Sequence, residues 1–366
     1  MGKRIVIKIG SNILSHELSG LDTDIIRSLA ENISKIASMG YEVVIVSSGA
    51  VAAGMKKLGL KSKPRDIRLK QAAAAIGQST LMWAYEKAFA EYKHKVAQIL
   101  LTREDFSDRK KYINSKNTII TLLSYGIVPV INENDTVTTD EIKFGDNDNL
   151  AALVAILIEA ERLVILSDVD GLYQKNPKIY PEAKLIPYVD EITSDIENIA
   201  GGTGSAVGTG GMYSKILAAQ KATSHGIAVN ITNGKKPELL ISIVEGKESG
   251  TFFNPCKEKI SHKKGWIAYS SRPKGSVSID DGAVKAITEM GKSLLPTGIV
   301  SIEGDFEVGD PVNCLNSNGK RIAKGLINYS APDIKKIMRK KTAEIEKILG
   351  YKYSDEAIHR DNMVIL

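Results

Sequence analysis

The chain has 366 residues and a mass of 39.7 kDa, a length that predicts two domains and a sizeable buried core. Its formal net charge of +6 is too small and too evenly spread for a polybasic nucleic-acid binder, and it suits a protein that handles small acidic substrates. Cys256 and Cys314 match no zinc or redox spacing, and the longest apolar run, 150–158, is too short to cross a bilayer, so we expect reduced thiols and a cytoplasmic protein.

Six short runs rich in β-branched residues recur along the first 255 residues. Each run is apolar throughout, which is typical of strands that are covered on both faces. Amphipathic segments such as 22–39, 65–91 and 147–158 have the length of crossover helices in βαβ units. The predicted fold is therefore an α/β, three-layer αβα sandwich with a largely parallel sheet. The predicted strands begin with the runs at 5–10, 43–48, 96–101, 127–132, 163–168 and 227–232.

Three of these predicted strands end in small or polar residues that lead into a helix or a turn. They are Gly10 with Ser11, residues 47–50, and Ser167 with Asp168. Ligands of open parallel sheets gather at the carboxyl ends of the strands, so we expect a binding site at these strand ends.

A glycine-rich run at 208–215, GTGGMYSK, indicates a phosphate site. Glycines let backbone N–H groups approach an anion, and a helix after them would direct its positive N-terminal end to the same place. Lys215 would lie one turn inside that helix. A flexible glycine linker is the alternative explanation of the run by itself.

The pattern changes after residue 253. A charged connector is followed by short strand-like pieces between frequent turn signals, which indicates a small β-rich barrel or sandwich. Residues 275–353 contain 12 basic and 10 acidic residues, so this segment is nearly neutral. Within it, KKIMRKKT at 335–342 predicts a locally basic helix. We therefore predict an α/β domain at 1–255, a linker at 256–274, a β-rich domain at 275–353 and a C-terminal tail at 354–366.

Common phosphate-binding and catalytic motifs do not fit. The only Gly-Lys-Ser, at 291–293, has Ala286 where a P-loop requires its first glycine. Val207 stands where the third glycine of a GxGxxG motif should follow Gly202 and Gly204. No HExxH or GxSxG is present, and no histidine has a partner at metal-ligand or triad spacing. The sequence thus argues against P-loop NTPases, Rossmann dehydrogenases and hydrolases of these types.

Taken in order, seven motifs resemble the amino acid kinase family, and within it the branch with a C-terminal PUA domain. The resemblance covers nearly the whole chain, and it implies an amino acid kinase domain at 1–255 and a PUA domain at 275–353. Departures from the family pattern are small. The motifs are KIGSNIL at 8–14, VSSGAVAAG at 46–54, QAAAAIGQ at 71–78, INENDTV at 131–137, FGDNDNLAA at 144–152, SDVDGLY at 167–173 and GTGGMYSK at 208–215.

The resemblance implies transfer of the γ-phosphoryl group of ATP to the γ-carboxylate of L-glutamate, the first step of proline synthesis. Lys8 and Lys215 would neutralise the transferring group and the phosphates from two sides, and Asp148 would accept hydrogen bonds from both lysines and orient them. Mg²⁺ would bridge phosphate oxygens, so no protein ligand is assigned to it. A carboxylate acceptor is already ionised at neutral pH, so no general base is required.

By the same resemblance, glutamate would bind at the start of the helix after the second predicted strand. The backbone N–H groups of Gly49 and Ala50 would receive a carboxylate, with the hydroxyl of Ser48 assisting. Asp135 would pair with the substrate ammonium group, and Asn147 would complete the pocket.

ATP would lie across the glycine run, with its sugar or base near the end of the fifth predicted strand. The ATP-binding residues that the resemblance implies are Lys8, Ser167, Asp168, Thr209, Gly210, Gly211, Met212, Tyr213, Ser214 and Lys215.

The family further implies feedback inhibition by proline, a dimer or tetramer, and glutamyl phosphate reductase as a functional partner. The alanine-rich helix at 71–82 is a candidate for subunit contact. Alternative activities are those of aspartate, N-acetylglutamate, carbamate and uridylate kinases of the same fold. A further alternative is RNA binding by the PUA-like segment, against which its near-neutral charge and the lack of an aromatic and basic platform argue.

Overall fold

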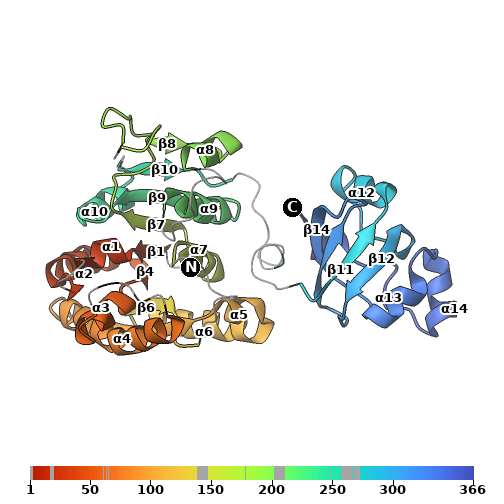
Figure 1. Cartoon of the computed structure of the whole chain (residues 1–366), viewed down its shortest axis with the longest axis horizontal. Coiled ribbons are helices and arrows are strands. Elements are labelled where there is room, and N and C mark those ends of the chain that lie inside the picture. The colour runs from red at the N-terminus through yellow and green to blue at the C-terminus, as the bar shows by residue number, and fades with distance from the viewer. Residues whose placement is uncertain are drawn as a thin grey trace. The chain divides into compact units, whose positions relative to one another are not determined.

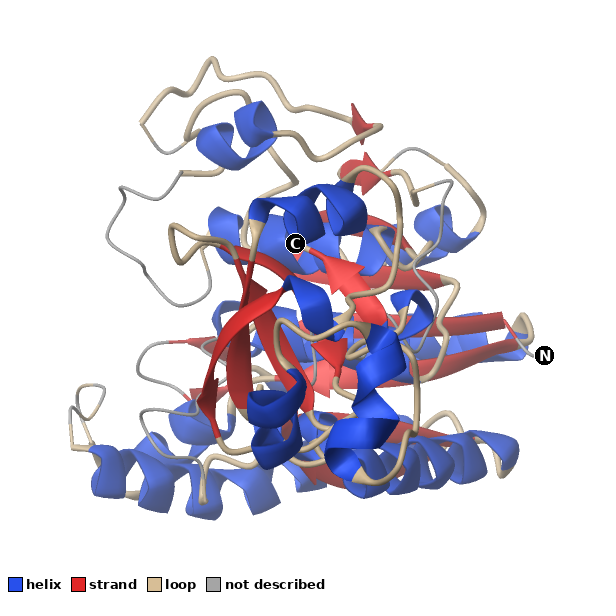
Figure 2. Cartoon of the chain, turned by 90° about the vertical axis from the view of Figure 1, so that its right-hand side faces the viewer, coloured by secondary structure: helices blue, strands red, loops and turns tan. Residues whose placement is uncertain are grey.

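The structure is a computed structural model, in which both of the chain's compact units combine helices with strands (Figure 2). The units consist of residues 1–105 with 109–259, and of residues 106–108 with 260–366. Each unit has a hydrophobic core of its own. The residues described are 3–16, 20–60, 62, 64, 66–137, 147–177, 179–201, 211–247, 249–256, 267 and 273–366.

An eight-stranded sheet forms the centre of the first unit, in the order β5-β6-β4-β1-β7-β9-β10-β8. The six predicted strands lie side by side in it and are all parallel. Two strands that the sequence analysis did not predict extend one edge, with β10 antiparallel to β9 and β8 parallel to β10. The strands are β1 (Lys3–Ile9), β4 (Tyr41–Ser47), β5 (Lys95–Leu101), β6 (Ile127–Glu133), β7 (Arg162–Ser167), β8 (Tyr188–Val189), β9 (Ala228–Asn233) and β10 (Thr251–Phe253), beside a hairpin of β2 (Ser15–His16) and β3 (Gly20–Leu21).

Helices cover both faces of this sheet, as Figure 1 shows, so the predicted three-layer αβα architecture is confirmed. One face carries α2 (Thr23–Ser38), α4 (Ile67–Ala90) and α10 (Leu239–Val244), whose apolar side chains form a common core with those of the strands. The other face carries α6 (Arg109–Ser124), α7 (Asn147–Leu157) and α9 (Met212–Thr223). Shorter helices are α1 (Ser11–Leu14), α3 (Ala50–Lys57), α5 (Arg103–Ser107) and α8 (Ser194–Ile199).

The two longest predicted helices of this unit begin at aspartates that cap them. Asp22 accepts hydrogen bonds from the backbone N–H groups of residues 24 and 25, and Asp66 accepts one from that of Arg68. A side-chain oxygen at this position satisfies N–H groups that have no partner inside the helix, which is why α2 and α4 start where they do.

Helices α3 and α4 cross in backbone contact because each has a glycine at the point where it faces the other helix. A Cβ atom on Gly54 would lie 1.7 Å from the Ala73 carbonyl oxygen, and one on Gly77 would lie 1.8 Å from that of Ala50. The alanine-rich stretch at 71–82, predicted as a candidate for subunit contact, therefore packs with its small residues against α3 of its own chain. Subunit contact by this helix stays a prediction.

The second unit is built on a five-stranded sheet, in the order β12-β11-β13-β14-β15. β11 and β13 are parallel, and the other neighbours are antiparallel. Residues 354–366, predicted as a tail, contribute β15 to this sheet. The elements are β11 (Gly275–Ile279), α12 (Asp281–Thr288), η2 (Pro296–Gly298), β12 (Ile299–Gly304), β13 (Pro311–Leu315), β14 (Arg321–Leu326), α13 (Ala331–Ile337), η3 (Thr342–Glu344), α14 (Ile345–Leu349), η4 (Arg360–Asn362) and β15 (Met363–Ile365).

The basic helix predicted at 335–342 is shorter than expected. α13 ends at Ile337, and Arg339 has a left-handed backbone with φ of 62° while its N–H donates to the Pro296 carbonyl at 2.9 Å. The lysines of this segment are thus divided between the end of a helix and the turn after it. Helical periodicity does not reveal where this helix ends, because the end is set by a contact with Pro296, a residue far away in the chain.

Within the described residues, none of the helices combines the length and the apolar character that a membrane span requires.

Candidate active site

The carboxyl ends of four neighbouring strands lie at one edge of the large sheet. In the register of the sheet, Ile9 at the end of β1 pairs with Ser47 at the end of β4 and with Leu166 near the end of β7. The backbone N–H of Ser48 donates to the Ile9 carbonyl at 3.0 Å, which ties the two strand ends together. Side chains that follow these strands are therefore held close to one another, as the parallel arrangement predicts.

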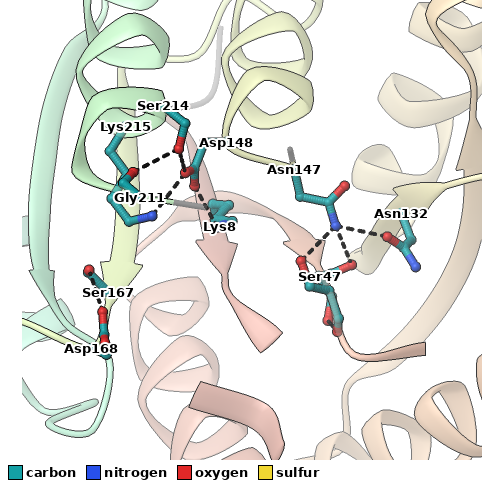
Figure 3. Close-up of polar contacts among 11 residues, drawn as sticks. Lys8, Ser47, Asn132, Asn147, Asp148, Ser167, Asp168, Gly211, Ser214 and Lys215 are labelled. Atoms are coloured by element: carbon teal, nitrogen blue, oxygen red, sulfur yellow. Dashed lines mark hydrogen bonds and ion pairs between the residues drawn. The ribbon is translucent and has the colours of Figure 1, made fainter. Parts of the chain in front are cut away.

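Two lysines bind the two oxygens of a single buried carboxylate. Lys8 Nζ lies 2.5 Å from Asp148 Oδ1, and Lys215 Nζ lies 3.0 Å from Asp148 Oδ2 (Figure 3). The exposed fractions of Lys8, Asp148 and Lys215 are only 3%, 0% and 5%. Both ion pairs that the resemblance implies are thus present, while the catalytic roles of these residues stay a prediction.

Three elements bring this ionic cluster together. Lys8 lies in β1 between two isoleucines that point into the opposite core, and strand alternation therefore turns it toward α7. Asp148 is in the first turn of α7, where the helix dipole favours a negative charge. Lys215 is in the first turn of α9, which packs beside α7.

Ser214 supports the carboxylate from α9. Its hydroxyl lies 2.9 Å from Asp148 Oδ2 and 2.8 Å from the Gly211 carbonyl oxygen (Figure 3). Gly211 is the residue before the first turn of α9. The start of this helix is therefore fixed to the ionic cluster by Ser214 as well as by Lys215.

The ionic cluster contains one carboxylate and two ammonium groups. An anion placed beside the two ammonium groups would be stabilised by their positive charge. A phosphoryl group is an anion of this kind.

A second cluster of hydrogen bonds adjoins the first through the neighbouring residue Asn147. Its side-chain Nδ2 donates to Ser48 Oγ at 2.8 Å, to the Ser47 carbonyl at 3.2 Å and to Asn132 Oδ1 at 2.9 Å (Figure 3). Asn132 Nδ2 donates in turn to Gln78 Oε1 at 3.0 Å. This amide network joins the end of β6, the end of β4, the start of α7 and the middle of α4.

A tyrosine of α4 forms a hydrogen bond with Ser47, the last residue of β4 before the turn. The hydroxyls of Ser47 and Tyr85 lie 2.9 Å apart, and both residues are buried. Burial raises the pKa of Tyr85, so its hydroxyl stays protonated. Gly49 follows with φ of +110°, a value that favours glycine, and α3 begins at Ala50. The N–H groups at the start of α3 are thus presented beside Ser48.

The remaining predicted residues that the structure describes lie at the same edge of the sheet. Ser167 is the last residue of β7 and Asp168 follows it, with Ser167 Oγ donating to Asp168 Oδ1 at 3.4 Å. Asp135 lies half-buried in the turn after β6. Met212 and Tyr213, which open α9, are also half-buried. Thr209 and Gly210 lie outside the described residues.

Asn132 and Gln78 were not predicted as site residues from the sequence, although both hydrogen-bond within the amide network. They belong to the motifs INENDTV and QAAAAIGQ respectively. A polar residue inside an otherwise apolar helical or strand pattern was the only available signal, and it does not identify a partner 54 positions away.

A second lysine of α9, Lys221, has a hydrogen-bond partner that is next to Asp148 in the sequence. Lys221 donates to Asn149 Oδ1 on α7, next to Asp148. Burial, assisted by the positive charge of Arg103, lowers the pKa of Lys221 to about 8. This amine is therefore partly neutral at slightly alkaline pH.

Comparisons with known proteins identify a known family for a long stretch of each unit. Residues 3–233 match the amino acid kinase family, and residues 275–349 match the PUA domain. A glutamate 5-kinase of Geobacter sulfurreducens is 53% identical over 364 residues, which cover 100% of this chain and 98% of that protein. A glutamate 5-kinase of Thermoanaerobacter sp. is 53% identical over 363 residues, which cover 99% and 98%. The structure of carbamate kinase from Giardia lamblia bound to AMP-PNP has the same fold, with a TM-score of 0.52 and 19% identity over 70% of this chain and 99% of that one.

Proposed function

This chain belongs to the amino acid kinase family, and we propose that it transfers the γ-phosphoryl group of ATP to the γ-carboxylate of L-glutamate. The product is L-glutamyl 5-phosphate, and the reaction is the first step of proline biosynthesis. Relatives that are glutamate 5-kinases match the chain along its whole length, including the PUA domain.

The ionic cluster of Lys8, Asp148 and Lys215 is the observation that carries the proposal. The main obstacle to the reaction is charge, because an anionic acceptor must approach a polyphosphate. Two ammonium groups held on one carboxylate can neutralise the transferring phosphoryl group from two sides. Asp148 fixes their positions before substrate binds, so little reorganisation is needed when the phosphoryl group moves.

In this mechanism no side chain abstracts a proton. The γ-carboxylate of glutamate is ionised at neutral pH, and it attacks the γ-phosphorus while the bond to the β-phosphate oxygen breaks. The two lysines act by charge and position, and the reaction requires no proton exchange with either of them. A mechanism of this kind needs fixed positive charges, which the ion pairs of Lys8 and Lys215 with Asp148 provide.

We assign the acceptor to the edge between β4 and α7. The N–H groups of Gly49 and Ala50 at the start of α3 suit a carboxylate, and the hydroxyl of Ser48 adds a donor beside them. Asn147 lies within hydrogen-bond distance of Ser48, and we assign it to the same pocket. Asp135 is the proposed partner of the substrate ammonium group.

We assign the nucleotide to the edge between β7 and α9. Ser167 and Asp168 would contact the sugar or base, and residues 209–215 would follow the phosphates. Mg²⁺ would enter with ATP, held by phosphate oxygens and water. Within the described residues, no three His, Cys, Asp or Glu side chains lie together as metal ligands.

Several properties of the family complete the proposal. Proline would inhibit by occupying part of the glutamate pocket, since it also carries a carboxylate and an ammonium group. We further propose a dimer or tetramer in the cytoplasm, whose reactive acyl phosphate passes to glutamyl phosphate reductase. The PUA domain would serve regulation or assembly, without specific RNA binding.

A panel of substrates tests the activity. We expect ADP release with L-glutamate to exceed that with aspartate, N-acetylglutamate, carbamate and UMP by orders of magnitude, at equal concentrations of acceptor and ATP. The same assay with added proline tests inhibition. A dominant rate with any other acceptor would contradict the proposal and identify the alternative kinase.

A further inference from the structure

A chain of three side-chain amides runs from the core of the first unit to the proposed acceptor pocket. Gln78 Oε1 accepts from Asn132 Nδ2 at 3.0 Å, and Asn132 Oδ1 accepts from Asn147 Nδ2 at 2.9 Å. We propose that Gln78 is a positioning residue for the acceptor amino acid, because it sets the orientation of Asn147 through Asn132. This inference rests on the proposed function and adds to it a residue that does not touch the substrate.

Backbone groups identify the oxygen and the nitrogen of each asparagine amide. The backbone N–H of Glu133, which can only donate, bonds Asn132 Oδ1 at 2.9 Å. The carbonyl of Ser47, which can only accept, bonds Asn147 Nδ2 at 3.2 Å. The oxygen and nitrogen of Asn132 and Asn147 are therefore assigned without ambiguity. Asn132 must then direct its Nδ2 group at an acceptor, and Gln78 Oε1 is that acceptor.

The consequence for the proposed acceptor pocket lies at Asn147, the last of the three amides. Asn147 Nδ2 is fully occupied by three protein acceptors, whereas its Oδ1 has no hydrogen bond among the described residues. Figure 3 shows this oxygen on the side of the amide away from Ser47 and Asn132. Asn147 therefore offers an acceptor, which suits an ammonium group, and rotating its amide would present a donor instead.

The other half of the Gln78 amide shows that stability alone does not explain the residue. Its Nε2 atom is buried, and it has no hydrogen-bond partner among the described residues. A buried unpaired donor destabilises a fold, whereas a methionine of similar shape would leave no such group at this position. Gln78 is therefore explained by the one acceptor that it supplies to Asn132.

Helix α4 holds Gln78 rigidly enough for this role. The preceding residue, Gly77, packs against the backbone of α3, and Tyr85, two turns further along α4, contacts Ser47. The same helix thus supports both the amide network and the turn that carries Ser48. A side chain on such an element can hold its partner to within a fraction of an ångström.

The test is the variant Gln78→Met in the full chain, with steady-state kinetics for glutamate and for ATP. We expect the KM for glutamate to rise about tenfold, the effect of losing one oriented hydrogen bond, while kcat and the KM for ATP change less than about twofold. The melting temperature should change little, because the variant removes one buried unpaired donor at residue 78 and creates another at Asn132. Gln98→Met makes the same chemical change at an exposed position of β5 and should leave all these values unchanged.

A double-mutant cycle identifies the route of the effect. In an Asn147→Ala background, Gln78→Met should raise the KM for glutamate by less than about twofold, since the residue through which it acts is gone. Gln78→Leu, which also lacks the acceptor oxygen, should reproduce the result, and it provides the measurement if the methionine variant does not fold.

Three results would overturn the inference. They are a wild-type KM for glutamate in both Gln78 variants, an equal effect with and without Asn147, and a loss of melting temperature that accompanies a fall in kcat and in affinity for both substrates. The last result would mean that Gln78 has a structural role only. Failure of the proposed function is distinguishable, because the unmodified protein would then not phosphorylate glutamate at all.

Discussion

Lys8 Nζ lies 2.5 Å from Asp148 Oδ1, and both side chains are almost completely removed from solvent. The two residues are 140 positions apart, and they meet because a strand side chain faces the first turn of the helix that covers it. A buried lysine without a partner would be costly, so we expect Asp148 to stabilise the fold in addition to the catalytic role proposed for it.

Asp148→Asn should reduce both stability and turnover. The amide keeps the shape of the side chain but removes the carboxylate that binds the two buried ammonium groups, a change that typically costs about 3–5 kcal/mol. Turnover should fall at least about 100-fold, because the lysines lose their fixed positions. Urea unfolding and the initial rate of ADP release measure the two effects. Unchanged unfolding would contradict the assignment of Asp148 as the anchor of both lysines.

Lys8→Met and Lys215→Met should each lower kcat by about 100-fold or more while leaving the protein folded. Methionine retains much of the aliphatic stem of lysine and removes the charge that neutralises the phosphoryl group. Lys247→Met, on the exposed surface, is the control. Circular dichroism and kcat are the measurements. Near-normal turnover in either buried-lysine variant would remove that lysine from the mechanism.

Asp135→Asn should act mainly on the binding of glutamate. The change removes the charge that we pair with the substrate ammonium group and preserves the size of the side chain, so the KM for glutamate should rise by about tenfold or more. The KM for ATP should stay the same. Asp24→Asn, in the exposed first turn of α2, is the matched control. If the glutamate dependence were unaltered, Asp135 would not belong to the pocket.

Gly77→Ala should destabilise the protein, although alanine favours helices. Its Cβ would lie 1.8 Å from the Ala50 carbonyl oxygen, a backbone atom that cannot move aside without shifting α3. A loss of at least about 2 kcal/mol in the free energy of unfolding is expected. Gly282→Ala, whose Cβ would meet only a side-chain oxygen at 3.3 Å, should be nearly neutral. Equal stabilities of the two variants would contradict the close packing of α3 on α4.

Lys221→Met should change the dependence of stability on pH. Burial lowers the pKa of Lys221 in the folded protein to about 8 from an ordinary 10.5, so the unfolded chain binds more protons at this residue between those values. The cost of burying the amine is therefore fully present below pH 8 and disappears as the pH rises to 10.5. The stability of the variant relative to the unmodified protein should fall by at most about 3 kcal/mol over that range. Urea unfolding at pH 7, 9 and 10 would reveal this, and a constant difference would rule it out.

Local patterns in the sequence predicted much of the fold. Apolar runs of four to eight residues identified the six parallel strands, since strands covered on both faces are apolar throughout. The short edge strands β8 and β10 were missed because two or three residues show no pattern. The end of α13 was missed because Arg339 is held by Pro296, a residue far away in the chain.

The sequence by itself determined the family motifs, their order, and the residue types of the site, including the two lysines and the aspartate between them. Only the tertiary structure decided that Gln78 and Asn132 join the site, that the alanine-rich helix packs on α3, and which way the amide of Asn147 points. The physical reason is that strands and helices depend on neighbours along the chain, whereas hydrogen bonds among remote side chains depend on strand register and helix packing. Those are properties of the assembled fold.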